Sequence, residues 1–174
     1  MERLLEACLS DAKKHLTYKE FAYPDKDSDI ARRYPRQPWG DKPAREILNF
    51  LGISGTKGRP WAIGYGFTEG VTPDHRLTRE RAESKLKEVI LESIRDAASL
   101  LPNFEDQPEQ VQTVLAVMAR ELGRTNLSGF KTTLRYCTMK DYHNVALALQ
   151  KTLWYASGGR RAKALVKRIQ DLDH

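Results

Sequence analysis

The chain has 174 residues, of which 40% are hydrophobic and 30% charged, with 29 Lys and Arg against 23 Asp and Glu, a formal charge of +6 and an isoelectric point of about 9.3. This length suits one compact domain or two small lobes that share a core, and the composition excludes a wholly disordered chain. No apolar run is long enough to cross a bilayer, and the N-terminal residues mix acids and bases into their apolar stretch, so we expect neither a transmembrane segment nor a signal peptide.

The N-terminal third predicts a mixed, irregular segment. Residues 3–16 carry apolar side chains at helical spacing and predict a short amphipathic helix. Four prolines then interrupt the stretch FAYPDKDSDIARRYPRQPWGDKP, and residues 44–51 predict a second short helix. The segment RPWAIGYGFTEGVTP is the most strand-like of the chain. In this segment the aromatic residues and Ile63 alternate with Gly64 and Gly66. This alternation predicts a hairpin whose backbone is approached closely by another part of the protein.

The rest of the chain predicts helices. Apolar residues at helical spacing predict a long helix over residues 78–101, and Pro108 and Gly123 delimit the next one. We expect Ser128 to cap a further short helix, and two more helices over residues 140–156 and 159–171. The predicted fold class is α+β, mostly α. It is a single domain with a small N-terminal lobe (1–77, containing an insertion at 26–60), a connecting helix (78–101) and a helical lobe (102–174).

The positive charge is concentrated in the last third of the chain. Residues 111–174 hold eleven Lys and Arg against four Asp and Glu, whereas residues 1–110 hold eighteen against nineteen. Such a segment indicates an anionic partner (nucleic acid, a membrane surface or a cell-wall polymer) or simply a solvated helical face. The basic residues of the last helix lie at mixed spacings. We therefore expect them to surround the helix and not to form one stripe: Arg160, Arg161, Lys163, Lys167 and Arg168. No nucleic-acid-binding signature accompanies them, so we do not expect a nucleic-acid partner.

The cysteines and histidines argue against metal or disulfide chemistry. Cys8 and Cys137 are too few for a disulfide framework, and the four histidines have no metal-ligand spacing. The sequence therefore predicts no metal site and no cofactor.

Several stretches resemble the phage-type lysozymes, glycoside hydrolase family 24. PWAIGYG, followed by Thr68 and GVTP, is similar to that family's β-hairpin, usually W-T-I-G-Y-G-H-T. LGRTNLSGFKTTLR and ALQKTLWYASGGRRAKALVKRIQ are similar to its later turn, its Trp-containing helix and its basic final helix. The resemblance covers roughly residues 59–171 in consistent order. It implies a lysozyme-like fold and a muramidase that cleaves peptidoglycan glycan strands.

The family's catalytic motif is Glu, eight residues, Asp, five residues, Thr, and this chain departs from it. Ala22-Tyr23-Pro24-Asp25 resembles the family's Ala-Tyr-x-Asp, so the resemblance implies that Asp25 is the second carboxylate. Counting back from Asp25 by the spacing of the motif puts Leu16 at the position of the family's Glu. Ala62 occupies the position of the family's Thr. Glycoside hydrolysis needs a proton donor as well as a second carboxylate, and a leucine supplies none. Glu20 is the substitute acid that we expect. Acids of the insertion are further alternatives: Asp27, Asp29, Asp41 and Glu46.

The resemblance also implies substrate-binding positions and a biological setting. Tyr23, Glu121 (where the family often has an amide) and Phe130 match substrate-binding positions. A phage lysozyme without an export signal would wait in the host cytoplasm until a holin opens the membrane, or would travel in the virion among other virion proteins. Because Leu16 and Ala62 replace polar groups, the alternative is a catalytically degenerate lysozyme fold that binds glycan or serves as a virion structural protein. A basic nucleic-acid-binding protein ranks below both.

Overall fold

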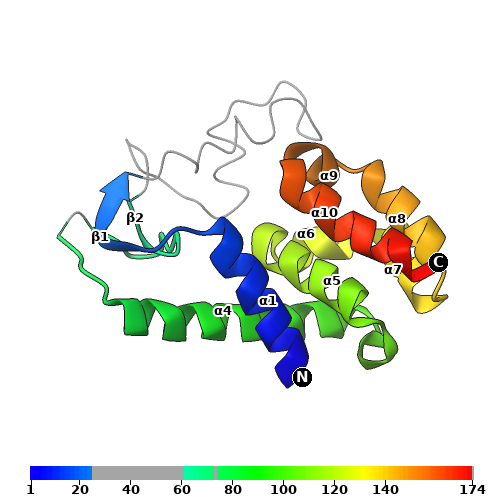
Figure 1. The fold of residues 1–174 in the computed structure, drawn as a ribbon, viewed down its shortest axis with the longest axis horizontal. Coiled ribbons are helices and arrows are strands. Elements are labelled where there is room, and N and C mark those ends of the chain that lie inside the picture. The colour runs from blue at the N-terminus through cyan, green and yellow to red at the C-terminus, as the bar shows by residue number, and fades with distance from the viewer. Residues whose placement is uncertain (25–60, 73, 174) are drawn as a thin grey trace. The chain divides into compact units, whose positions relative to one another are not determined.

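The structure is a computed structural model of the chain, and it describes residues 1–24, 61–72 and 74–173 (Figure 1). The described residues are mostly helical with one small antiparallel sheet of two strands, which confirms the predicted α+β, mostly α fold class. The insertion 26–60 and the helix expected over residues 44–51 lie outside the described residues.

The chain divides into two compact units. One, the helical unit, comprises Met1–His15 and Glu83–His174, and the other, the sheet unit, comprises Leu16–Ala82. The first helix therefore groups with the C-terminal helices, whereas the sequence assigned it to a lobe of residues 1–77. Its apolar stripe packs against a helix of the C-terminal part, which explains the grouping. The assignment of the whole chain to one lysozyme-like domain stays a prediction.

The sheet unit is built on the pairing of β1 (Lys19–Pro24) with β2 (Trp61–Gly64), which run antiparallel. Lys19 pairs with Gly64 and Tyr23 pairs with Ala62. Within the described residues of the strand-like segment, an isolated antiparallel bridge between Ile63 and Phe67 closes the turn. The predicted hairpin is therefore a tight turn, and the long-range partner of β2 is a strand that sequence reasoning did not identify.

Gly64 is the close-packed position of this turn. Its φ of +66° lies in the left-handed region, and an added Cβ would lie 2.8 Å from Leu77 and 2.9 Å from Phe67 side-chain carbons. Gly66, with a φ of +91°, has nothing within 4 Å of that position. The expected close approach to the backbone is thus confirmed at Gly64 and wrong at Gly66.

The helical unit contains eight helices among the described residues, one of which, α4, begins in the sheet unit. They are α1 (Glu2–His15), α4 (Arg79–Leu100), α5 (Glu109–Leu122), α6 (Arg124–Ser128), α7 (Lys131–Thr138), α8 (Tyr142–Gln150), α9 (Leu153–Ser157) and α10 (Gly159–Gln170). Short 3-10 turns, η1 and η2, cover Phe104–Asp106 and Asp171–Asp173.

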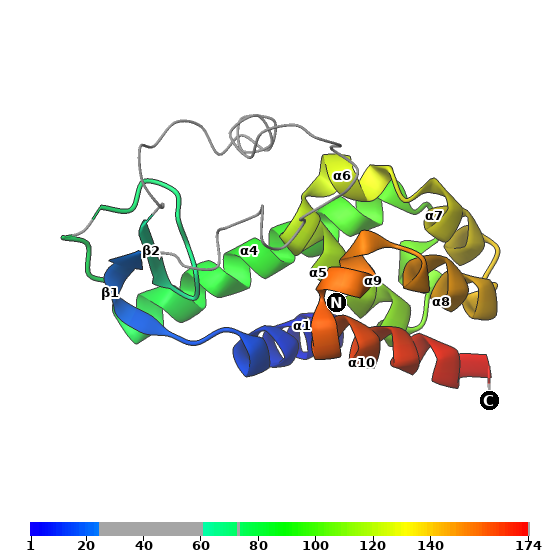
Figure 2. The same cartoon turned by 90° about the horizontal axis from the view of Figure 1, so that it is seen from above.

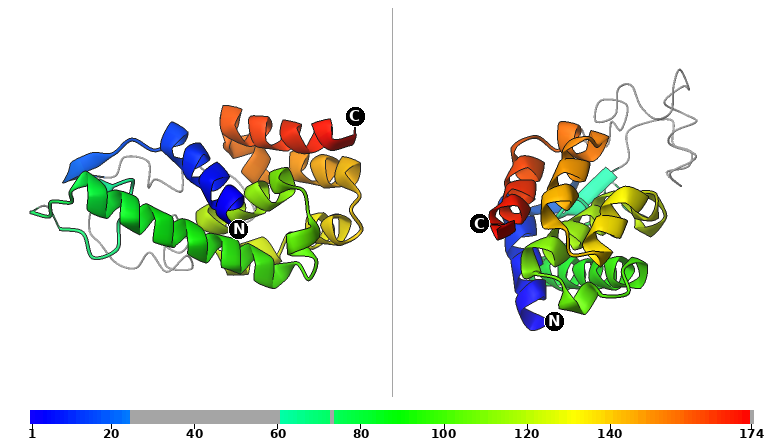
Figure 3. Two further views of the ribbon diagram at one scale, coloured as in Figure 1. Left: turned by 60° about the horizontal axis from the view of Figure 1, so that its bottom comes forward. Right: turned by 90° about the vertical axis from the view of Figure 1, so that its right-hand side faces the viewer.

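Helix α5 is the central element of this unit. Every residue from Val111 to Ala119 is buried, because the helix is apolar nearly all round and contacts α1, α6 and α10 on different sides. Helices α8 and α10 run side by side, as Figures 2 and 3 show from different directions. Helix α10 turns a buried stripe inward: Ala162, Leu165, Val166 and Ile169. Charged residues at the edges of this stripe and of α5 form the candidate site.

Two local predictions are wrong. The helix expected over residues 140–156 is broken into α8 and α9, because Thr152 adopts an extended conformation and its hydroxyl caps α9 at the Tyr155 amide. Ser128 ends α6 instead of capping α7, and its hydroxyl donates to the Thr125 carbonyl at 2.6 Å. Both errors concern Ser or Thr side chains whose hydrogen bonds depend on the local backbone.

Candidate functional site

The residues of the catalytic motif are only partly described. Asp25 lies outside the described residues, and Tyr23 is described only through its backbone pairing with Ala62. Leu16 follows the last residue of α1, and Ala62 is completely buried in β2. The described part of the motif therefore presents apolar side chains at the two positions where the resemblance expects Glu and Thr.

Glu20 is fixed at the surface of the sheet unit. Its backbone carbonyl accepts from the Leu77 amide at 2.9 Å, and its carboxylate accepts from Arg76 Nε at 2.6 Å. The exposed fractions of the two side chains are 36% for Glu20 and 66% for Arg76. The carboxylate oxygen that accepts from Arg76 is engaged by that contact. For Glu20 to act on a substrate through this oxygen, the Arg76 contact must be exchanged.

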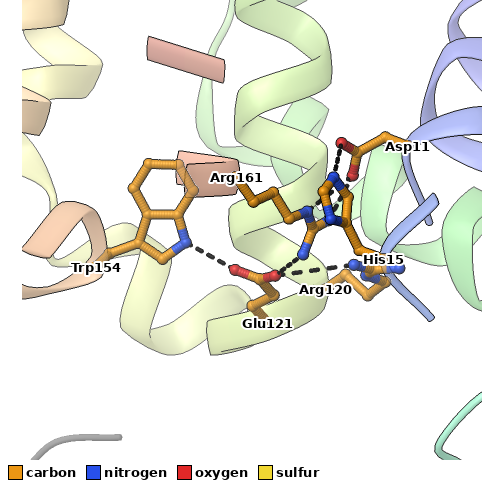
Figure 4. Close-up of polar contacts among 6 residues, drawn as sticks. All are labelled: Asp11, His15, Arg120, Glu121, Trp154 and Arg161. Atoms are coloured by element: carbon orange, nitrogen blue, oxygen red, sulfur yellow. Dashed lines mark hydrogen bonds and ion pairs between the residues drawn. The ribbon is translucent and has the colours of Figure 1, made fainter. Parts of the chain in front are cut away.

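Glu121, at the end of α5, is held by two donors from other helices (Figure 4). Its Oε2 accepts from Trp154 Nε1 at 2.8 Å, and its Oε1 accepts from Arg161 Nη1. Trp154 is 4% exposed and packs in the core of the helical unit. The two bonds fix the Glu121 side chain, so the position identified from the resemblance is part of a larger polar arrangement.

Arg161 joins this carboxylate to a second one on the first helix. Its Nε donates to Asp11 Oδ2 at 3.1 Å, and its Nη2 contacts the same oxygen. The other oxygen of Asp11 lies 3.7 Å from His15 Nε2, one helical turn further along α1. The exposed fraction is 8% for the Asp11 side chain and 15% for that of Arg161. One guanidinium therefore connects α1, α5 and α10 through ionic hydrogen bonds, part-buried at Asp11 and more exposed at Glu121.

We call the six residues of Figure 4 the α1–α5–α10 cluster: Asp11, His15, Arg120, Glu121, Trp154 and Arg161. Arg120 completes it, with a guanidinium nitrogen 3.8 Å from Glu121 Oε1 and a side chain that is 12% exposed. Burial, followed by repulsion from Arg161, lowers the pKa of the Arg120 guanidinium. The negative charges of the two carboxylates balance the positive charges of the two guanidiniums. The cluster is therefore suited to hold its own side chains in place and to orient a bound group.

The buried thiols offer no nucleophile. Burial, with a contribution from the Asp11 charge, raises the pKa of Cys8 to about 12, and burial raises that of Cys137 to about 12. Both remain protonated thiols at neutral pH and therefore lack the reactive thiolate form.

Phe130 stands immediately before α7, with its amide donating to the Leu127 carbonyl at 3.0 Å and its side chain half-buried. The structure brings Glu121 together with Trp154 and Arg161; it does not pair Phe130 with them through any described hydrogen bond. A substrate-binding role for Phe130 stays a prediction.

Sequence reasoning missed Asp11, Arg120 and the inward direction of Arg161. One signal was present: Asp11 interrupts the apolar stripe of α1 between Cys8 and Ala12, and a charge on a buried face calls for a partner. The expected distribution of bases around α10 is wrong. Only Arg161 turns inward, and the remaining four are exposed: Arg160, Lys163, Lys167 and Arg168.

Among the described residues, no group of three or more His, Cys, Asp or Glu side chains could hold a metal ion, and none of the helices in that part of the chain combines the length and apolarity needed to cross a membrane.

The comparison with known protein families gives one match. The sequence model of the family described as phage lysozyme matches residues 53–171, which is more than half of the chain. The matched range includes Ala62, Glu121 and Phe130 but begins after Glu20 and Asp25. The assignment of roles to those two carboxylates therefore depends on the local motif alone.

Proposed function

The chain belongs to the phage lysozyme family, and from this premise we propose that it acts on peptidoglycan as a muramidase, hydrolysing the β-1,4 bond between N-acetylmuramic acid and N-acetylglucosamine. The single observation that carries this proposal is the family match over residues 53–171. Membership of the family indicates cell-wall degradation as its general activity. The particular bond and the activity of this chain belong to the proposal.

The proposed reaction assigns roles to two carboxylates. The leaving glycosidic oxygen takes a proton, the C1–O bond breaks, and water supplies hydroxide to C1 and returns a proton to the enzyme. We assign the second carboxylate to Asp25, from the Ala-Tyr-x-Asp resemblance, and the proton-transferring group to Glu20. The Arg76 contact must be exchanged for a contact with substrate when Glu20 takes that role, because Arg76 already donates to the Glu20 carboxylate.

Lysis of chloroform-treated Gram-negative cells, followed by mass analysis of released muropeptides, tests the proposal. We expect Asp25→Asn and Glu20→Gln each to reduce the rate by about 100-fold or more. Glu69→Gln, an exposed change in the same sheet unit, is the matched control and should retain full activity. No release of muropeptides by the unmodified protein across about pH 5–8 would contradict the proposal.

A second candidate function is glycan binding without cleavage, as in a degenerate lysozyme or a virion component. Its specific support is that Leu16 and Ala62 occupy the Glu and Thr positions of the motif and that Ala62 is completely buried. This candidate predicts retention on purified peptidoglycan with no soluble product. It also predicts that Leu16→Glu combined with Ala62→Thr creates hydrolysis, while Leu16→Gln with Ala62→Thr does not.

The exposed bases of α10 support attraction to an anionic wall in either case. Arg160 lies in the first turn of the helix, where a positive charge opposes the helix dipole. Lys163 and Lys167 repel each other at a spacing of four residues. Because these charges do not stabilise the helix, a role in binding an anionic surface is the better explanation for them. We propose that the protein reaches the wall from the host cytoplasm after a holin opens the membrane, or from the virion. Binding to DNA, which we do not expect, would weaken steeply with salt.

A further inference from the structure

Arg120 is the least satisfied charged group of the α1–α5–α10 cluster. Its side chain is only 12% exposed, yet within the described residues its guanidinium donates no hydrogen bond and its closest ionic contact is 3.8 Å from Glu121 Oε1. A distance of 3.8 Å exceeds the range of a hydrogen bond. A guanidinium carries five N–H donors, and within the described residues those of Arg120 make no hydrogen bond.

The neighbouring carboxylates are positioned by donors other than Arg120. Glu121 accepts from Trp154 at Oε2 and from Arg161 at Oε1. Asp11 accepts from Arg161 at one oxygen and lies near His15 at the other. In this geometry the guanidinium of Arg120 keeps its hydrogen-bonding capacity for an acceptor from outside the chain.

The guanidinium of Arg120 can be reached from solvent. In the described residues, only Asn103 Oδ1 and Gln107 Oε1 are side-chain polar atoms that are both sealed from solvent and without a partner. The nitrogens of Arg120 have no hydrogen-bond partner and are not among those atoms, so each retains some solvent contact. Arg120 is therefore held in place by its largely buried stem while its donors remain open to a ligand.

The charges around Arg120 favour a neutral acceptor over an anion. Arg161 and Arg120 are balanced by Asp11 and Glu121, and a negatively charged ligand would add a third anion to this neutral group. A carbonyl oxygen without formal charge accepts a charge-assisted hydrogen bond and introduces no such repulsion. Among the groups of a peptidoglycan glycan strand, the acetamido carbonyl of each amino sugar has this chemistry.

We propose that Arg120 is a ligand-binding residue that donates to the acetamido carbonyl of an N-acetylated amino sugar, held in place by the cluster around Glu121 and Arg161. This inference rests on the proposed action on peptidoglycan for the identity of the ligand. It adds a specific contact, made by a residue that the sequence resemblance does not mark, to a site whose neighbouring Glu121 is already engaged within the protein.

Calorimetric binding of N-acetylglucosamine oligomers to the full chain tests the proposal. We expect Arg120→Met to weaken binding by about 10- to 100-fold, the loss of one charge-assisted hydrogen bond. Arg120→Lys, which keeps the charge but not the planar fork, should weaken it less and should fold even where the Met variant does not. Arg95→Met, an exposed arginine of α4 in the same helical unit, is the matched control and should bind normally. Deacetylated oligomers should bind the unmodified protein and the Arg120→Met variant equally weakly.

Each result separates this inference from the function it rests on. If the unmodified protein binds N-acetylated oligomers and neither Arg120→Met nor Arg120→Lys changes the affinity, the inference is wrong and the proposed function stands. Competition by acetate or phosphate that is lost in Arg120→Met would show that the residue takes an anion, which also overturns the inference. If the unmodified protein neither binds the oligomers nor releases muropeptides, the proposed function itself fails.

Discussion

Two carboxylate–guanidinium sites among the described residues contain the same groups in opposite environments. In the sheet unit, Glu20 and Arg76 meet at the surface, where their side chains are 36% and 66% exposed. In the helical unit, Asp11 and Arg161 are 8% and 15% exposed and connect helices that are far apart in the sequence. Water screens the first pair and leaves its members free to exchange partners, whereas the second must remain paired because neither charge can be resolvated. Burial thus makes the Asp11–Arg161 pair structural and leaves the Glu20–Arg76 pair available for chemistry.

Removal of Arg161 should produce the largest effect. Arg161→Met leaves the carboxylates of Asp11 and Glu121 without their shared partner, and we expect a loss of about 3–5 kcal/mol in the free energy of unfolding. The melting temperature should fall by on the order of 10 °C. Thermal unfolding followed by circular dichroism measures both.

The neighbouring Arg160→Met provides the control for this prediction. Arg160 is exposed, so its substitution should change stability by less than about 0.5 kcal/mol. If the two substitutions lowered the free energy of unfolding equally, the buried network would contribute no more to stability than an exposed arginine does.

The next largest effect is expected in the sheet unit, from packing instead of charge. Gly64→Ala combines a left-handed backbone with carbons 2.8–2.9 Å from the new methyl group, and we expect a destabilisation of about 2–4 kcal/mol. Gly66→Ala has the unfavourable backbone alone and should cost about 1–2 kcal/mol. Urea unfolding of both variants measures the difference, and the prediction is wrong if Gly66→Ala is the more destabilising.

Alkaline pH should weaken the helical unit through its buried thiols. Because the pKa of Cys8 and of Cys137 is raised from 9.0 to about 12 in the folded protein, the unfolded chain loses these protons first. Their contribution to stability is complete below pH 9 and is lost as the pH rises toward 12, at up to about 1.4 kcal/mol per pH unit for each thiol. Urea unfolding between about pH 8 and pH 10 should therefore show a shallower decline in the Cys8→Ala/Cys137→Ala variant. Parallel declines would reject this assignment.

The smallest effect is expected at the exposed pair. Arg76→Ala should change the free energy of unfolding by less than about 1 kcal/mol, and less still in high salt. If Glu20 transfers a proton in the proposed reaction, the same substitution should maintain or increase activity, since it removes a competing partner. A large loss of stability would show that the pair is structural after all, and the contrast between the two sites would disappear.

Local pattern was enough to predict most of the helices. Helical spacing and the delimiting residues Pro108 and Gly123 predicted α5 to within a residue, and the apolar stripes predicted α1, α4 and α10. The break between α8 and α9 was missed because it depends on the hydrogen bond of one threonine. The pairing of β2 with β1 was missed because partners distant in the chain leave no local trace.

For the candidate site, the sequence identified positions, and packing decided their partners. Residue order and composition determined the mostly helical α+β class, the basic C-terminal segment, and the family through motifs that the family match bears out. Only the tertiary structure decided that Arg161 faces Asp11 and Glu121 while Arg160 faces solvent, and that Arg120 donates no hydrogen bond within the part of the chain that the structure describes. The reason is physical: a helix carries its charges at fixed angles, but whether a charge meets water or another charge depends on what packs against it, and that is a property of the fold.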